Sequence, residues 1–253
     1  MHATTRSHLL ACEGCRNAEP LPFAFTMAFQ PIVDVEERRV YAYEALVRGV
    51  NGSSAASILE QVTVHNRYRF DQECRATAVE LAARLDLDCR VSINIMPNAM
   101  YDAATCIRAT LAAARRFDFP VERIMFEVSE QEQVEETGHV DSILEHYRER
   151  GFVTAIDDFG AGFAGLSLLV EFQPHVVKID MGLLRGISED PVRQVVVRGV
   201  IDVCRNLDID MVAEGVETTA EYGWLRAEGV RYFQGYLFAR PELEALPEIS
   251  WPE

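Results

Sequence analysis

Short apolar runs alternate with amphipathic helical patterns along most of this 253-residue chain. The first two runs, at 25–33 and 38–47, predict strands that are joined by an acidic turn at 34–37. Because a parallel crossover needs about a dozen residues or more, so short a link predicts an antiparallel pair. Beyond this pair, the order changes to helix followed by strand.

The later elements follow the helical and extended periods of the sequence. Helical patterns occupy 54–63, 68–86, 103–116, 136–150, 164–172, 189–207 and 219–227, and strand patterns occupy 90–95, 122–128, 152–157, 175–179, 209–213 and 230–233. With the first pair, this makes eight strands that are mostly linked through helices. We therefore predict an α/β fold, a single (β/α)8 TIM-like barrel with an antiparallel first strand. A doubly wound open sheet is the alternative.

The chain length agrees with one barrel domain, since α/β barrels typically have about 250 residues. We assign residues 23–253 to this domain. Residues 1–22 show no recognisable strand or helix and are expected to form a flexible N-terminal leader. Cys12 and Cys15 in the leader could supply half of a zinc or redox site. Structural zinc needs four ligands, so we interpret these cysteines as incidental.

The chain is strongly acidic, with 40 acidic and 24 basic residues and a net charge of −16. Such a surface repels duplex DNA and anionic lipid, so we expect neither a nucleic-acid polymer nor a membrane as partner. No apolar stretch approaches the roughly 18 residues of a membrane span. The six cysteines show no disulfide framework, which predicts reduced thiols and a cytoplasmic location. A small anionic ligand is compatible with this charge if bound cations reverse the local field.

Polar side chains stand at the ends of six apolar strand patterns, where barrel enzymes keep their chemistry. These residues are Glu44, Asn94, Glu127, the pair Asp157 and Asp158, Lys178, and the pair Glu214 and Glu217. Hard oxygen ligands with one amide and no histidine favour Mg²⁺ or Mn²⁺ over zinc. The pattern therefore predicts a metal site at the mouth of the barrel.

Two adjacent aspartates, Asp157 and Asp158, end one of these strand patterns. Without a cation, their repulsion and lost hydration would push at least one toward protonation. A helix cap or a turn is the alternative role, since aspartate favours both, but a cap rarely needs two. In a two-metal hydrolase, one aspartate can bridge the cations while its neighbour holds the second.

The next segment, Gly160 to Gly165, spells G-x-G-x-x-G, which is also the pattern of a dinucleotide-binding turn. Such a turn places pyrophosphate on a helix N-terminus and has no need of two preceding aspartates. Pro174 also cuts the following helix short. A nicotinamide site is therefore the weaker interpretation.

Lys178 lies inside an apolar strand pattern, where an unpaired ammonium is costly. The carboxylate cluster would neutralise it and leave it placed to orient an attacking water. A structural ion pair with Asp180 is the alternative. Arg48, just past Glu44, could bind phosphate through its planar guanidinium.

This set of residues resembles the EAL-domain phosphodiesterases, which hydrolyse the bacterial messenger cyclic di-GMP to linear pGpG. The resemblance runs from about Phe25 to Pro241, and the order and spacing of its motifs agree throughout. The motifs are Gln30-Pro31-Ile32-Val33, Glu44-Ala45-Leu46-Val47-Arg48, Asp157-Asp158-Phe159-Gly160, Lys178-Ile179-Asp180, Ala213-Glu214-Gly215-Val216-Glu217 and Gln234-Gly235-Tyr236.

The resemblance implies a barrel of the predicted kind with two Mg²⁺ or Mn²⁺ ions, and it implies a role for each matching residue. One ion would be bound by Glu44, Asn94, Glu127 and Asp157, and the other by Asp157, Asp158 and Glu214, with Asp157 bridging. Lys178 would contact the nucleophilic water, Glu217 would be an active-site carboxylate, and Glu130 would brace the loop after Asp158. The residues implied to contact the substrate are Gln30, Arg48 and Gln234. A homodimer formed through helices next to that loop is also implied.

Two departures from the family pattern are visible. The loop reads Ala161-Gly162-Phe163-Ala164-Gly165 where threonine-glycine-tyrosine-serine-serine is commoner, and Gly49 replaces a frequent tryptophan. We predict a metal-dependent hydrolase of cyclic di-GMP, in which Lys178 and Glu214 position or deprotonate the attacking water. The alternative is a catalytically silent cyclic di-GMP receptor. Such receptors usually lack some of the metal ligands, whereas this chain keeps every one.

Overall fold

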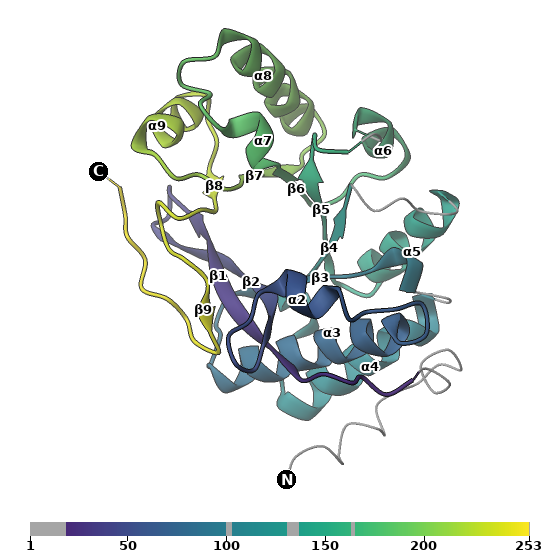
Figure 1. Cartoon of the computed structure of the whole chain (residues 1–253). Coiled ribbons are helices and arrows are strands. Elements are labelled where there is room, and N and C mark those ends of the chain that lie inside the picture. The colour runs from purple at the N-terminus through teal and green to yellow at the C-terminus, as the bar shows by residue number, and fades with distance from the viewer. Residues whose placement is uncertain (1–18, 100–102, 131–136, 163–164, 253) are drawn as a thin grey trace.

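The computed structural model describes residues 19–99, 103–130, 137–162 and 165–252. Its strands form a closed barrel with helices around it (Figure 1). The barrel strands are β1 (Phe25–Asp34), β2 (Arg39–Gly49), β3 (Arg90–Asn94), β4 (Ile124–Ser129), β5 (Val153–Phe159), β6 (Val176–Ile179), β7 (Asp210–Ala213) and β8 (Tyr232–Phe233). The helices are α2 (Ala55–Leu59), α3 (Arg67–Arg84), α4 (Ala103–Phe117), α5 (Thr137–Glu149), α6 (Gly165–Glu171), α7 (Met181–Leu184), α8 (Pro191–Asn206) and α9 (Thr219–Ala227). Among these described helices, none combines the length and apolar character needed to cross a membrane.

The first strand closes the barrel because it pairs with strands on both sides. β1 runs antiparallel to β2 along its whole length, from Phe25 to Asp34, and antiparallel to β8 at Val33. The strands from β2 to β8 are parallel neighbours in chain order. The predicted closed barrel with an antiparallel first strand is confirmed, and the open doubly wound sheet is wrong.

A buried aspartate fixes the hairpin between β1 and β2. Oδ1 of Asp34 accepts hydrogen bonds from the backbone N–H groups of Glu36 at 3.1 Å and Glu37 at 3.2 Å. Arg231, which precedes β8, donates to both oxygens of the same carboxylate, at 2.9 Å from Nε and 2.6 Å from Nη2. One side chain thus joins the acidic turn to the strand that closes the barrel.

Two predicted boundaries differ from the structure for local reasons. The helix expected at 54–63 ends at Leu59. Beyond it, the side chain of Asn66 accepts from the N–H of Thr63 at 2.7 Å and donates to the carbonyl of Gln61 at 3.1 Å, which holds a turn instead. The strand expected at 152–157 continues to Phe159, so both aspartates of the pair belong to β5.

Besides the 3₁₀ turns η2 (Pro97–Ala99) and η3 (Val121–Arg123), one short α-helix and one short strand were not predicted. α7 is a single turn that begins where Asp180 accepts a hydrogen bond from the N–H of Gly182 at 2.8 Å. β9 (Glu242–Leu243) pairs with β1 at Ala28 and Phe29, along the edge of β1 that β8 leaves free. Residues 1–18 of the expected leader, with Cys12 and Cys15, lie outside the described residues.

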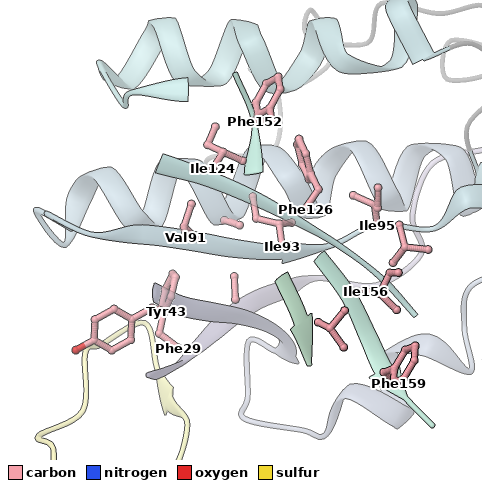
Figure 2. Packing of buried hydrophobic residues seen from close by; sticks show 14 of the residues in the cluster. Phe29, Tyr43, Val91, Ile93, Ile95, Ile124, Phe126, Phe152, Ile156 and Phe159 are labelled. Carbon is pink, nitrogen blue, oxygen red and sulfur yellow. The ribbon is translucent and has the colours of Figure 1, made fainter. Parts of the chain in front are cut away.

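The larger apolar core lies between the strands and the helices that surround them. Figure 2 shows part of it, including Val91 and Ile93 of β3 and Phe126 of β4. The ring of Phe126 packs 4.9 Å from that of Tyr147 in α5 and 5.0 Å from that of Phe152, measured between centroids. The outward-facing strand positions are apolar because helices cover them.

A second, smaller apolar cluster takes side chains from β1, β2 and β4 to β8. Tyr41 of β2 belongs to it, and its other buried residues, one from each of these strands, are Ile32, Ala42, Met125, Ala155, Val176, Val212 and Tyr232. Because strand side chains alternate between faces, the residues two positions closer to the mouth face the same way. Those residues are Gln30, Glu44, Glu127, Asp157, Lys178, Glu214 and Gln234. An apolar layer inside the barrel therefore supports a polar layer directly above it.

Candidate metal centre

Five carboxylates meet at the polar layer, from β2, β4, β5 and the residue directly after β7. They form two groups, Glu44 with Glu127 and Asp157, and Asp157 with Asp158 and Glu214. Within each group, one oxygen of every residue lies within 4.8 Å of the others. Asp157 belongs to both groups, so the two candidate cation positions share a ligand. Beside them, Nδ2 of Asn94 donates a hydrogen bond to Oε1 of Glu44 at 2.8 Å.

Lys178 is fully buried at the centre of this layer. Its ammonium lies 2.7 Å from Oε1 of Glu214, 2.9 Å from Oδ1 of Asp157, 3.0 Å from Oε2 of Glu127 and 3.4 Å from Oε2 of Glu44. Burial alone would lower the pKa of Lys178, but these carboxylates hold it well above its usual value. The alternative ion pair between Lys178 and Asp180 is wrong, because Asp180 caps α7 instead.

The same crowding acts on the carboxylates. Burial raises the pKa of Glu127 well above its usual range, and Lys178 offsets this only in part. Burial and the neighbouring charge of Asp157 raise the pKa of both Glu214 and Asp158. Carboxylates in such a site favour protons or cations, because bare negative charges so close together are unstable.

Divalent cations fit these residues in both charge and donor chemistry. Five carboxylates with one ammonium leave four negative charges when all are ionised, which two divalent cations balance. Among the described residues, Oε1 of Glu127 is buried and has no hydrogen-bond partner. A buried carboxylate oxygen without a partner is costly, and a cation would satisfy it. Every donor is a hard oxygen, as Mg²⁺ and Mn²⁺ prefer.

A cavity of about 400 Å³ opens above the carboxylates. Gln30, Gln234 and Glu217 of the predicted site line it. Nε2 of Gln234 donates to Oε2 of Glu44 at 2.7 Å, and Nε2 of Gln30 donates to the carbonyl of Ala239 at 3.2 Å. The two amides are therefore held at the layer itself, where they can orient a ligand.

Two predicted site residues are less closely joined to the layer. Glu217 lies outside both carboxylate groups, and its Oε1 pairs with Nη2 of Arg185 at 3.0 Å at the rim of the cavity. Arg48 does not line the cavity, and its Nη1 donates to the carbonyl of Val47 at 2.7 Å. Reaching a ligand from there would require another side-chain rotamer.

Glu130 holds both ends of the loop that follows the aspartate pair. Its Oε2 accepts from the N–H of Gly160 at 2.6 Å, and its Oε1 accepts from the N–H of Gly165. A Cβ on Gly162 would come within 2.8 Å of the Glu130 carbonyl oxygen, so this glycine allows the close approach. The glycines therefore pack the loop onto Glu130, and the Gly165 N–H is not free for a pyrophosphate. Phe163 and Ala164 of the departing loop motif lie outside the described residues.

Asp158 adopts a backbone conformation that is rare for residues other than glycine, with φ at +54°. Its Oδ2 accepts a hydrogen bond from Oγ of Ser129 at 3.2 Å. Ser129 was not predicted, although it ends β4 beside Asp157 in the sheet. Strain of this kind persists where the surrounding structure enforces it, typically at functional sites.

Other cavity residues had no role assigned from the sequence. Leu46 and Tyr236 stand within the quoted motifs and Met181 outside them, and all three line the cavity. A Cβ on Gly215, whose φ is +62°, would come 2.5 Å from Cβ of Met181. A glycine two residues beyond β7 therefore lets α7 pack closely at the rim.

The sequence of the chain is similar to those of several known proteins. The antirepressor BluF of Escherichia coli (strain K12), which is blue light- and temperature-regulated, is 35% identical over 227 residues, covering 89% of this chain and 56% of BluF. The cyclic di-GMP phosphodiesterase PA2567 of Pseudomonas aeruginosa is 29% identical over 228 residues, covering 87% of this chain and 38% of PA2567. The chain thus spans about half or less of these curated relatives.

Solved structures agree with the fold over nearly the whole chain. A standalone versatile EAL protein from Vibrio cholerae O395, in a c-di-GMP-bound form, is 51% identical with a TM-score of 0.89, covering 91% of this chain and 98% of that one. BlrP1 of Klebsiella pneumoniae, in a manganese and cyclic di-GMP complex, is 37% identical with a TM-score of 0.86, covering 92% and 60%. The model of the family described as EAL domain matches residues 23–241. By this match over most of its length, the chain belongs to the EAL domain family.

Proposed function

We propose that this chain is a metal-dependent phosphodiesterase that hydrolyses cyclic di-GMP to linear 5′-pGpG. The observation that carries the proposal is the pair of carboxylate groups that share Asp157. Sharing a ligand brings two cations close enough to act on one phosphate, as in other two-metal hydrolases. The names of similar proteins support the substrate, since PA2567 is a cyclic di-GMP phosphodiesterase and the V. cholerae protein was crystallised with c-di-GMP.

Each cation position has its own ligand set in this proposal. Glu44, Asn94 and Glu127 would hold one cation and Asp158 and Glu214 the other, with Asp157 bridging. Two Mg²⁺ or Mn²⁺ ions would bind phosphate oxygens and lower the pKa of an attacking water. Their charge also explains how so acidic a protein would accept an anionic substrate.

The remaining residues would position the reactants. Lys178 would donate a hydrogen bond to the attacking water, since its ammonium stays charged. Oε1 of Glu214, 2.7 Å from that ammonium, would accept the proton of the water. Attack in line would break the bond from phosphorus to the ribose 3′-oxygen, so the product keeps a 5′-phosphate. The amides of Gln30 and Gln234 would orient the ligand, with Arg48 and Glu217 acting at the rim.

The decisive test is a product assay on purified protein. Incubation with cyclic di-GMP and Mn²⁺ should yield pGpG by chromatography, and a chelator should stop the reaction. Asp157→Asn replaces the carboxylate shared by both cation positions with a neutral amide, which has only one oxygen, and should lower turnover by about a thousandfold or more. Asp202→Asn, an equal charge change on the exposed face of α8, should leave turnover unchanged. An Asp157→Asn variant that matches the wild type would overturn the ligand assignment.

A catalytically silent receptor is the second candidate, because one observation favours it. BluF, which matches 89% of this chain, is an antirepressor by name. Tight binding of cyclic di-GMP in the presence of Mn²⁺ without any pGpG would select this alternative.

We also infer a homodimer and a cytoplasmic location. α6 follows the loop held by Glu130, and on it Leu166 is 55% and Val170 80% exposed. Residues four apart lie on one helix face, so these two side chains form an apolar strip beside the active-site loop. The four cysteines of the described residues, Cys74, Cys89, Cys106 and Cys204, form no disulfide, as a reducing compartment favours.

A further inference from the structure

The end of the barrel opposite the carboxylates carries a group of arginines. Arg39 is the first residue of β2, Arg90 is the first residue of β3, and Arg123 directly precedes β4. These three strands are neighbours in the barrel and run in the same direction, so their first residues meet at one end (Figure 1). The three side chains line a cavity of about 400 Å³ together with Tyr41, Asp88 and Glu122.

These arginines have unused hydrogen-bonding capacity. Neither Arg90 nor Arg123 makes an ion pair with any carboxylate of the described residues, and Nη1 of Arg123 has only a long contact of 3.5 Å to the carbonyl of Leu87. Arg39 is 66% exposed, and its Nε lies 3.9 Å from Oδ2 of Asp34. Nε of Arg90 is buried and lacks a hydrogen-bond partner in the described part of the chain. A buried donor without an acceptor is unfavourable, so an acceptor beside Arg90 would stabilise the site.

Arg90 is nevertheless held in place by its surroundings. Its guanidinium carbon lies 4.7 Å from the centre of the Tyr41 ring, a favourable cation–π contact. The hydroxyl of Tyr41 donates in turn to Oδ2 of Asp210 at 3.4 Å. The arginine is therefore preorganised for a ligand, which lowers the entropy lost on binding.

The charge of the cavity differs from that of the molecule. Three arginines face two carboxylates there, whereas the whole chain has a net charge of −16. The other titratable residues of the lining are Tyr41 and Cys89. Burial raises the pKa of the Cys89 thiol to about 11 and raises that of the Tyr41 hydroxyl above its usual value, so both are neutral at physiological pH. Among the lining residues positive charge exceeds negative charge by one, while Asp34 beside Arg39 and Asp210 beside Tyr41 lie just outside the lining.

We propose that this cavity binds a nucleoside monophosphate. The planar forks of Arg39, Arg90 and Arg123 match a phosphate group, which arginine binds in bidentate fashion. Asp88 and Glu122 supply acceptors for the hydroxyl and N–H groups of a sugar and base. A volume of about 400 Å³ exceeds the need of a lone phosphate and lies in the range of small-molecule pockets.

The test is a calorimetric titration of the full chain with GMP in the presence of a chelator, which leaves the carboxylate mouth without cations. Guanosine, which lacks the phosphate, is the comparison ligand. Arg123→Gln removes the cavity arginine with the weakest internal contacts and should weaken GMP binding by about tenfold. Arg39→Gln, at the exposed rim of the same cavity, should act in the same direction.

Two control variants separate this cavity from other charges. Arg205→Gln, an equal charge change on α8, and Asp157→Asn, at the opposite end of the barrel, should both bind GMP like the wild type. Weaker binding at higher salt would support the phosphate contact. The proposal is overturned if GMP gives no binding, if guanosine binds as well as GMP, or if both arginine variants bind GMP like the wild type. Loss of binding in Asp157→Asn would place GMP at the carboxylate mouth instead and would also overturn it.

Discussion

At the scale of single residues, the buried ammonium of Lys178 offsets the repulsion between the carboxylates at the mouth of the barrel. One buried ammonium contacts carboxylates from β2, β4 and β5 and the residue after β7. Such a cluster is stable only while positive charge is present, because a buried carboxylate that loses its partner is left unpaired. Lys178 and bound divalent cations would therefore both stabilise the same buried carboxylates.

We expect Lys178→Met to lower the free energy of unfolding by about 3–5 kcal/mol in the presence of a chelator. Mn²⁺ should then raise the melting temperature more for the variant than for the wild type, because the cations replace the missing charge. Turnover should still fall at saturating Mn²⁺, since the water loses a donor. Thermal unfolding with and without Mn²⁺, together with the product assay, measures both effects.

Arg185→Met is the matched control for this change. Arg185 pairs with Glu217 at the exposed rim, where an ion pair contributes about 0–1 kcal/mol. The stability of the Arg185→Met variant and its response to Mn²⁺ should stay close to those of the wild type. An identical Mn²⁺ response in Lys178→Met and the wild type would contradict the shared role of lysine and cations.

The residues of the metal centre were largely predictable, but their contacts were not. The sequence shows polar residues at the ends of apolar runs, and that pattern alone indicates Glu44, Asp157 and Lys178. It could not decide between Asp180 and the carboxylates as partners of Lys178, because Glu44 is 134 residues away and reaches it only after the barrel closes. Ser129 was missed for the same reason.

At the scale of elements, the loop after β5 depends on one carboxylate of the neighbouring segment. Glu130→Gln keeps the size of the side chain but replaces one acceptor oxygen with a donor, so it cannot accept from both Gly160 and Gly165. We expect turnover to fall by about 10–100-fold, since the loop adjoins Asp158, with little change in melting temperature. Glu145→Gln on α5 is the control. A Glu130→Gln variant that loses stability but keeps normal turnover would show that these hydrogen bonds stabilise the fold without affecting catalysis.

The hairpin of β1 and β2 depends on Asp34 in a pH-dependent way. Burial works against its charge, but hydrogen bonds and charge from Arg231 outweigh this and lower the pKa of Asp34 below its usual value. A group whose pKa is lower in the folded state contributes stability above its unfolded pKa of about 4 and loses it as the pH falls.

Asp34→Asn should therefore destabilise the protein by about 2–3 kcal/mol at pH 7. The difference from the wild type should shrink as the pH falls below about 4, because the wild-type carboxylate also becomes neutral there. Denaturant unfolding at several pH values measures this, with Asp202→Asn as an exposed control. A difference that stays constant with pH would exclude the ionised carboxylate as its cause.

Short elements set the limit of prediction at this scale. Long helical patterns predicted α3, α4 and α8, and in α4 and α8 the amphipathic period repeats over several turns. α7 has one turn and depends on a cap from Asp180 and on the close approach of Gly215 to Met181. β9 has two residues and exists because β8 leaves part of β1 unpaired. Both depend on tertiary neighbours more than on local pattern.

At the scale of the whole molecule, the two ends of the barrel carry opposite local charge. Parallel strands place their last residues at the mouth, where carboxylates gather, and their first residues at the base, where Arg39, Arg90 and Arg123 gather. The mouth was predictable because polar residues end apolar runs. The base was not, because an arginine before a strand is usually solvated and only the side-by-side placement of β2, β3 and β4 makes a cavity.

The proposed homodimer can be tested through the exposed strip on α6. Val170→Glu places a charge where the wild type is 80% exposed, so the monomer should tolerate it, but a symmetric interface would bury two like charges. Light scattering after size exclusion should show a dimer for the wild type and a monomer for Val170→Glu. Val64→Glu, at a position that is 65% exposed between α2 and α3, should remain dimeric. Because α6 begins at Gly165, whose N–H is bound by Glu130, loss of the dimer should also lower turnover. A Val170→Glu variant that stays dimeric would exclude this strip as the interface.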